Sequence, residues 1–318
     1  MADDQLSEAL DLVEVRGVLS SGIAERGPWV TRVPAAYPLP PSAAHPLKFL
    51  IMVRGRAQLS TDGVDGPIEL EPGDIAILNR RTWLQVEGGA GDGPRREILP
   101  EIGVPAARLA NDSGADDLLI GGRVELNPAG DALLLEALPP LGHIRAADAA
   151  GALHARLHQL FDEVTGNRMG STFAIQQHAQ LLLLEMLRAY VDQAELPPGW
   201  LRVLTDQRLR PVLRLMHAEP ARHWGLEELA REAAMSRTTF AERFRAVAGV
   251  PPLAYLNRWR MLLARRALRD SDIPVRSLAN ELGYTSESAF SNAFKREVGE
   301  SPLRHRHRMR SELAAVRA

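Results

Sequence analysis

The pattern of apolar and polar positions divides the chain into a strand-like first half and a helical second half. From Leu47 onward, short apolar runs are separated by Gly, Asp and Pro, as in LKFLIMV, PIEL and IAIL. Such spacing is typical of antiparallel strands joined by turns. A further strand is predicted over 118–126, LLIGGRVEL, and Asn127 and Pro128 end it.

Helical spacing begins near residue 148. Leucines recur every three or four positions in two stripes, over 153–161 and 181–190, and TGNRMGS separates them. This pattern predicts a helical hairpin that either covers the strands or pairs with a second copy of the chain. The stretch PPGW at 197–200 ends the hairpin, and the residues after it read as helices divided by turns.

Two segments of the helical half, 226–252 and 275–302, repeat one pattern. Each has a short helix, a small residue in a tight turn, a serine that can cap the next helix, and two phenylalanines that pack this second helix on the first. The matching residues are Ala234 and Gly283 in the turns, Ser236 and Ser286 at the caps, and Phe240 with Phe244 and Phe290 with Phe294 in the second helices. The arrangement is typical of a helix-turn-helix motif.

With Phe290 and Phe294 directed inward, the positions around Ser288 and Asn292 must face outward. Short hydroxyl and amide groups can enter a DNA groove and bond to base edges, and a cation such as Lys295 can bind phosphate. The alternative is a solvated helix surface that is merely rich in serine. The duplication and the arginine-rich helix between the copies, PLAYLNRWRMLLARRALRDSD, favour DNA. If that helix holds the copies about 34 Å apart, one chain reads two successive major-groove segments.

Charge is distributed unevenly along the 318 residues. Residues 1–199 hold 16 Lys and Arg against 27 Asp and Glu, a balance of −11, whereas residues 200–318 hold 22 against 13, a balance of +9. This indicates a basic module that meets a polyanion, joined to an acidic module that does not. The chain has no cysteine, which excludes disulfides and thiolate chemistry. It has no apolar run long enough for a membrane span and no secretory signal, so we expect a cytoplasmic protein with no membrane partner.

Residues 206–308 resemble the DNA-binding domain of AraC/XylS-type transcription regulators, through RWRMLLARRALRDSDIPVRSLANELGYTSESAFSNAFKREVGESPLRHR. The resemblance implies a sequence-specific regulator that binds double-stranded DNA, forms a homodimer and contacts RNA polymerase. It places base-reading positions on Thr238, Ala241, Glu242, Ser288, Ser291 and Asn292, and DNA-backbone contacts are expected from Arg237, Arg258, Lys295 and Arg296. Glu242 departs from the cation often found there, and its carboxylate either accepts a hydrogen bond from cytosine N4 or lowers the affinity by repelling a nearby phosphate.

The first half resembles the cupin-type N-terminal domain of one AraC-type subgroup, through FLIMVRGRAQLS, IELEPGDIAIL, LLIGGRVEL and LLLEALPPLGHI. Enzymatic cupins hold a metal with histidines and a glutamate. The stretch 55–86 has no histidine, and Trp83 stands where many relatives place one. His45 alone, and the pair His154 and His158, are expected to be structural or solvated. We therefore expect no metal, no cofactor and no catalytic residue, and an apolar interior available to a small organic effector.

The predicted fold class is α+β. A cupin-like antiparallel β-barrel is expected over 1–147, a helical dimerisation segment and linker over 148–198, and an all-α DNA-binding domain over 199–318 in which a long helix joins two helix-turn-helix units. The predicted function is an AraC-type transcription regulator controlled by a small molecule. The alternatives are a cupin enzyme fused to a DNA-binding module, and an architectural protein that binds DNA without sequence preference. The outward Thr, Ser and Asn disfavour the last, since such proteins insert apolar wedges.

Overall fold

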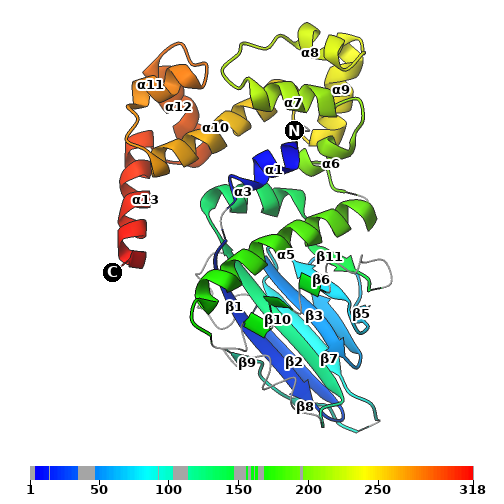
Figure 1. Ribbon diagram of the computed structural model, residues 1–318. Coiled ribbons are helices and arrows are strands. Elements are labelled where there is room, and N and C mark those ends of the chain that lie inside the picture. Colours follow the sequence, from blue (N-terminus) through cyan, green and yellow to red (C-terminus); the bar gives the residue numbers. More distant parts are fainter. Residues whose placement is uncertain are drawn as a thin grey trace. The chain divides into compact units, whose positions relative to one another are not determined.

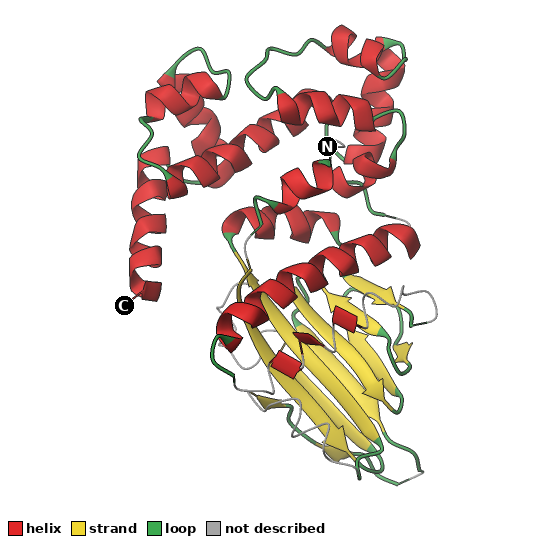
Figure 2. Cartoon of the chain, in the orientation of Figure 1, coloured by secondary structure: helices red, strands yellow, loops and turns green. Residues whose placement is uncertain are grey.

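The computed structural model describes residues 4–13, 15–34, 47–91, 93–102, 114–146, 155–156, 159–160, 162–163, 168–193 and 196–317. The chain forms two compact units, one of Glu14–Leu196 and one built from Met1–Val13 together with Pro197–Ala318. In the described residues the first unit combines strands with helices, and the second contains helices and loops (Figures 1 and 2). None of the described helices has both the length and the apolarity that a membrane span needs.

The strands of the first unit form two sheets. One has the order β11-β6-β3-β10-β1-β9 and the other the order β5-β4-β7-β2-β8, and every pairing is antiparallel except the short one between β2 and β8. The bounds are β1 Val15–Glu25, β2 Trp29–Pro34, β3 Leu47–Arg54, β4 Ala57–Thr61, β5 Ile68–Leu70, β6 Ile75–Leu78, β7 Trp83–Gly88, β8 Arg96–Glu97, β9 Glu101–Ile102, β10 Asp117–Leu126 and β11 Leu141–Ile144.

The core of this unit lies between the two sheets. Alternate residues of each strand point inward, so that Leu50 and Met52 of β3 and Leu84 and Val86 of β7 belong to one buried cluster. The prediction of a closed β-barrel is wrong. Among the described strands none forms a backbone ladder with a strand of the other sheet. The physical reason lies at the edges: β8 and β9 each contain two residues, too few to continue the ladder from one sheet to the next.

A buried hydrogen bond also connects the two sheets. The indole Nε1 of Trp29, on β2, donates to Asp117 Oδ2, on β10, over 2.7 Å. The backbone amide of Arg56 donates to the other oxygen of Asp117 at 3.2 Å. Trp29 lies so close to Gly88 that a Cβ there would come within 2.7 Å of its ring. The inner face therefore contains polar groups that are paired within the fold.

The first unit contains two long helices, α3 and α5, among the described residues. Helix α3 (Pro128–Ala137) begins at Asn127, whose side-chain oxygen accepts from the Gly130 amide at 2.8 Å. Helix α5 (Ser171–Gln193) is the second of the two predicted leucine-rich helices, and it buries Leu182, Leu187 and Tyr190. Most of the first predicted helix, including His154 and His158, lies outside the described residues, as does His45.

The second unit consists of helices α1 and α6 to α13. Their bounds are α1 Gln5–Leu10, α6 Trp200–Thr205, α7 Arg210–Ala218, α8 Leu226–Glu232, α9 Arg237–Ala248, α10 Pro252–Asp270, α11 Val275–Glu281, α12 Glu287–Val298 and α13 Pro302–Arg317. Helix α1 packs against α7, and Ala9 and Leu12 are buried there. No sequence pattern predicted that residues 1–13 join this unit.

Candidate nucleic-acid interface

The first repeated segment folds as two helices, α8 and α9, joined by a tight turn. Ala234 in this turn has a φ of 52°, in the left-handed region that a small residue tolerates best. The Ser236 hydroxyl accepts from the backbone amide of Thr239 at 3.2 Å and caps α9. Phe240 and Phe244 are fully buried, and their ring centroids are 5.7 Å apart in an edge-on arrangement. The predicted turn, cap and buried pair therefore occur in this segment.

The second repeated segment, α11 and α12, has the same local geometry. Gly283 occupies the left-handed turn position with a φ of 79°. The Ser286 hydroxyl accepts from the Ala289 amide at 3.1 Å and caps α12. Phe290 and Phe294 are fully buried, with ring centroids 5.8 Å apart. Since the buried rings fix the inward face of α12, its opposite face is fixed as well.

The six predicted base-reading positions lie on α9 and α12, away from the buried rings. Thr238, Glu242, Ser288 and Asn292 are exposed, and Ala241 and Ser291 are half-buried. Each helix therefore presents polar groups to solvent on one side: Thr238 and Glu242 on α9, and Ser288 and Asn292 on α12. Their contact with base edges stays a prediction.

The predicted backbone cations differ in what surrounds them. Arg237 forms an ion pair with Glu227 at 3.4 Å, and Arg258 forms one with Glu297 at 3.5 Å. Lys295 and Arg296 are exposed in the last turns of α12, and neither forms an ion pair within the part of the chain that the structure describes. If these residues contact DNA, Lys295 and Arg296 can bind a phosphate without breaking an ion pair, whereas Arg237 and Arg258 must first release a carboxylate.

Helix α10 connects the two helix pairs, as Figure 1 shows. Its apolar side packs against α9 at one end and against α12 and α13 at the other, through Tyr255, Leu256, Trp259, Met261, Ala264 and Leu268. The predicted strut is present, although Leu263 is only half-buried. Its length and burial make it the element that sets the relative placement of α9 and α12.

Arg260 on α10 is a positioning residue that the sequence did not single out. Its guanidinium donates to the Pro220 carbonyl at 2.6 Å and to the Arg222 carbonyl at 2.9 Å. It also lies 5.7 Å from the ring centroid of Tyr284, in the turn of the second pair. One side chain therefore fastens the loop before α8 to the turn before α12. No periodicity predicts this role, because the acceptors are backbone carbonyls.

Comparison with known proteins places this geometry in a family. A family model described as Cupin matches residues 4–192, and one described as Helix-turn-helix domain matches residues 229–308. A protein of Streptomyces lividans named as an AraC-like transcription regulator is 35% identical over 306 residues, covering 94% of this chain and 96% of its own. A protein of the same name from Streptomyces antibioticus is 36% identical over 305 residues, covering 94% and 97%.

The chain belongs to the AraC-like transcription regulators. Among solved structures it is similar to the DNA-binding domain of the transcriptional factor AdpA in complex with a target DNA, with 34% identity, 34% of this chain and 96% of that chain covered, and a TM-score of 0.32. Because the helix-turn-helix match over residues 229–308 lies in the helical unit, that unit is the DNA-binding part of the regulator, and the strands of the sheet unit lie in the stretch that matches the cupin model.

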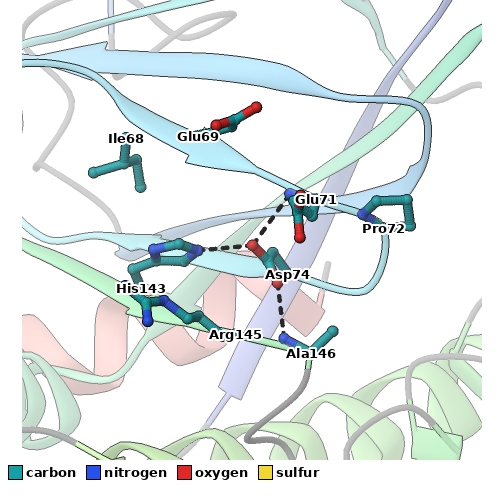
Figure 3. A pocket seen from close by; sticks show the side chains of 8 residues that line it. All are labelled: Ile68, Glu69, Glu71, Pro72, Asp74, His143, Arg145 and Ala146. Atoms are coloured by element: carbon teal, nitrogen blue, oxygen red, sulfur yellow. Dashed lines mark hydrogen bonds and ion pairs between the residues drawn. The ribbon is translucent and has the colours of Figure 1, made fainter.

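The cupin domain of this AraC-like chain carries a polar pocket of about 440 Å³ beside β5 and β11. Figure 3 shows Asp74 directed toward His143, Glu71 and Ala146. Asp74 Oδ2 lies 2.9 Å from His143 Nε2 and accepts from the Glu71 amide at 3.1 Å, and Oδ1 accepts from the Ala146 amide at 2.7 Å. Both carboxylate oxygens therefore hold the ends of β6 and β11 together.

The environment of Asp74 fits a structural role. Burial raises the pKa of its carboxyl, but the hydrogen bonds from the Ala146 and Glu71 amides and from His143 outweigh this, so that its pKa lies below the ordinary value. His143 was missed in the sequence because it is distant from the stretch 55–86 and reaches β6 only through the register of β11 with Ala76. Among the described residues no group of three or more His, Asp or Glu could hold a metal ion.

Proposed function

We propose that this AraC-like regulator reads two successive segments of the major groove, one with α9 and one with α12. The observation that carries the proposal is the equivalence of the two helix pairs. Each has a left-handed small residue, a serine cap and a fully buried pair of phenylalanines, and each leaves polar side chains exposed on the opposite side. An amide such as that of Asn292 can pair with adenine N6 and N7, and hydroxyls can bond to either purine or pyrimidine edges.

The experiment separates base reading from phosphate contact. A duplex enriched from a random pool by the full-length chain serves as the specific site, and a scrambled duplex serves as the reference. We expect Asn292→Ala to weaken binding to the enriched duplex by about 1–3 kcal/mol and to relax preference at one base pair. Lys295→Ala should weaken binding to both duplexes and reduce the slope of log K against log salt by about one unit.

Asn280→Ala is the matched control for the amide. Asn280 is exposed on α11 and is not among the predicted base-reading residues, and its replacement by alanine removes the same side-chain amide group. Its affinities should match those of the unaltered chain. If Asn292→Ala weakens both duplexes equally, or behaves as Asn280→Ala does, the assignment of base reading to α12 is refuted.

We also propose that a second copy of the chain covers the outer face of α5. Phe173 has 69% of its surface exposed, and Leu181, two turns further on the same face, has 38%. Large apolar side chains exposed at this spacing along one helix are typical of a helix–helix interface. Sedimentation over a range of concentrations should show a dimer that Leu181→Asp converts to a monomer. Gln58→Asp, a change to the same residue at an exposed polar position of β4, outside α5, is the control.

Control by a small molecule is the remaining part of the proposed function. An effector bound in the cupin domain would shift which spacing of DNA half-sites a dimer can reach, and no covalent bond need form or break. Contact with RNA polymerase is the output that we propose, and the role implies a cytoplasmic protein in a bacterium. The measurement is the affinity for the enriched duplex with and without candidate effectors.

A further inference from the structure

The inner face of the six-stranded cupin sheet carries two positively charged side chains on neighbouring strands. Lys48 on β3 stands directly opposite Arg123 on β10 in the antiparallel register. Both point inward, because Leu50 two positions along β3 and Leu119 four positions along β10 belong to the buried core. Only 6% of Lys48 and 5% of Arg123 is exposed. Two like charges thus face each other across neighbouring strands, an arrangement that is destabilising by itself.

Lysine is scarce in this chain, which makes its use here informative. Of the 38 Lys and Arg residues, two are lysines, Lys48 and Lys295, and the others are arginines. Burial, and then the charge of Arg123, lowers the pKa of Lys48 to about 8, so that the ammonium is still mostly protonated at neutral pH. Within the described residues no carboxylate forms an ion pair with Lys48. Burying a charged amine without a counter-charge costs free energy, so an anion bound beside Lys48 would stabilise the fold.

A small cavity adjoins Lys48. It measures about 20 Å³, and its polar lining is made by Lys48, Thr31 and Ser21. Thr31 is fully buried, and its hydroxyl has no hydrogen-bond partner within the described residues. Gly121 leaves space at the wall, because a Cβ there would lie 2.8 Å from the Ser21 hydroxyl. A hydroxyl and an ammonium group therefore line one cavity, and within the described residues neither has a protein acceptor.

The opposite wall of the cavity is apolar. Leu50, Leu84 and Val86 from both sheets line it. A ligand that fits must combine one negative charge with a small apolar part. A dianion such as phosphate would leave its further oxygens against these side chains, and a neutral molecule would leave the ammonium uncompensated.

We propose that this cavity binds the carboxylate of a small organic monoacid, with Lys48 as its counter-charge, Thr31 as a hydroxyl donor and the apolar wall against its alkyl group. As the identity of an effector, this assignment rests on the function proposed above. The cavity measures about 20 Å³, so acetate should enter with little rearrangement, whereas the longer chain of butyrate must displace the leucine and valine side chains.

The two lysines allow a direct test on the full-length chain. Biosynthetic labelling with lysine carrying ¹³C at Cε gives two NMR signals, one from buried Lys48 and one from exposed Lys295, which serves as internal reference. Acetate and butyrate are the probes, and acetamide and butyramide are their uncharged controls. We expect each acid to shift the Lys48 signal in a saturable manner and to raise the pKa of Lys48 above about 8, while Lys295 and both amides give no change.

Three outcomes would overturn the proposal. One is a Lys48 signal that neither acid moves. Another is an equal shift with acid and amide, and the third is an equal shift with sodium chloride, which would make the site one for any small anion. None of these outcomes bears on DNA reading by α9 and α12, because no duplex is present in the titration.

A pair of variants gives an independent check. Lys48→Met should remove the rise in melting temperature that butyrate produces in the unaltered chain. Lys295→Met, the same change at the other lysine, should keep it. Loss of the rise in both variants, or in neither, contradicts the assignment. Should Lys48→Met not fold, the NMR titration of the unaltered chain still decides. An effect of butyrate on affinity for the enriched duplex, absent in Lys48→Met, would identify the site as that of the effector.

Discussion

Replacement of Arg260 by methionine should loosen the connection between the two helix pairs. The change keeps most of the aliphatic stem and removes the guanidinium, which donates to the Pro220 and Arg222 carbonyls at 2.6 and 2.9 Å and lies 5.7 Å from the Tyr284 ring. Hydrogen bonds from charged donors contribute about 1.5–3 kcal/mol each, and a cation–π contact about 0.5–1 kcal/mol. Arg260 is half-buried, and water can reach the Arg222 carbonyl, so we expect a net loss of about 2–4 kcal/mol in the free energy of unfolding.

Urea unfolding of the full-length chain, followed by tryptophan fluorescence, measures this loss. Trp224 and Trp259 lie in the helical unit near the altered contacts and report on it. Arg266→Met is the matched control, because Arg266 is an exposed arginine of the same helix whose ion pair with Asp270, at 3.8 Å, should contribute well under about 1 kcal/mol. A second measurement compares the enriched duplex with one that has a base pair inserted between the segments predicted to be read by α9 and by α12. The insertion should penalise the unaltered chain more than Arg260→Met.

The refuting result is specific. If the free energy of unfolding of Arg260→Met is within about 0.5 kcal/mol of that of Arg266→Met, the carbonyl contacts do not stabilise the unit. If it is destabilised but tolerates the inserted base pair no better, the contacts stabilise the fold without setting the placement of α9 relative to α12.

Three further predictions concern other buried contacts. Phe290→Ala should cost about 3–5 kcal/mol in unfolding free energy and melt the second helix pair, as seen by circular dichroism. Gly283→Ala should cost more than about 1 kcal/mol by urea unfolding, because its φ is 79° and the new Cβ would meet the Ala221 carbonyl at 2.1 Å. Asp74→Asn should destabilise the cupin domain more at pH 7 than at pH 3. The depressed pKa of Asp74 gives stability that is present above about pH 4 and lost as pH falls through the folded-state pKa. An equal loss at both pH values would contradict this.

Local determinants explain why the DNA-binding half could be predicted. Ser236 and Ser286 cap the next helix through bonds three residues away, and Phe240 with Phe244 packs at helical spacing, so the sequence pattern carries the geometry. The contacts of Arg260 could not be predicted in this way. They reach about forty residues back along the chain to carbonyls that have no side-chain signature.

In the cupin domain the same limit affects the site itself. The alternation of apolar and polar residues and the turn residues between them predicted the strands. The pairing of Lys48 with Arg123 could not be predicted, because it depends on the register of two strands that are distant in sequence. Whether the sheets close into a barrel depends on how far the edge strands extend, and β8 and β9 proved too short. Residues 1–13 joined the helical unit through tertiary burial of Ala9 and Leu12, which a short amphipathic segment does not specify.

The two helices predicted to read DNA have equivalent backbone geometry, but their cations differ in the ion pairs that they form. On α9, Arg237 is paired with Glu227, and Arg243 is paired with the largely buried Asp206 at 2.7 Å. On α12, Lys295 and Arg296 have no such partner within the described residues. A cation that is already paired gives up one interaction to make another, and it contributes less to phosphate binding than one that is merely hydrated. The caps and the buried rings, which the fold needs, are thus the same in both copies, and we predict that Lys295 and Arg296 contribute more to DNA affinity than Arg237 and Arg243 do.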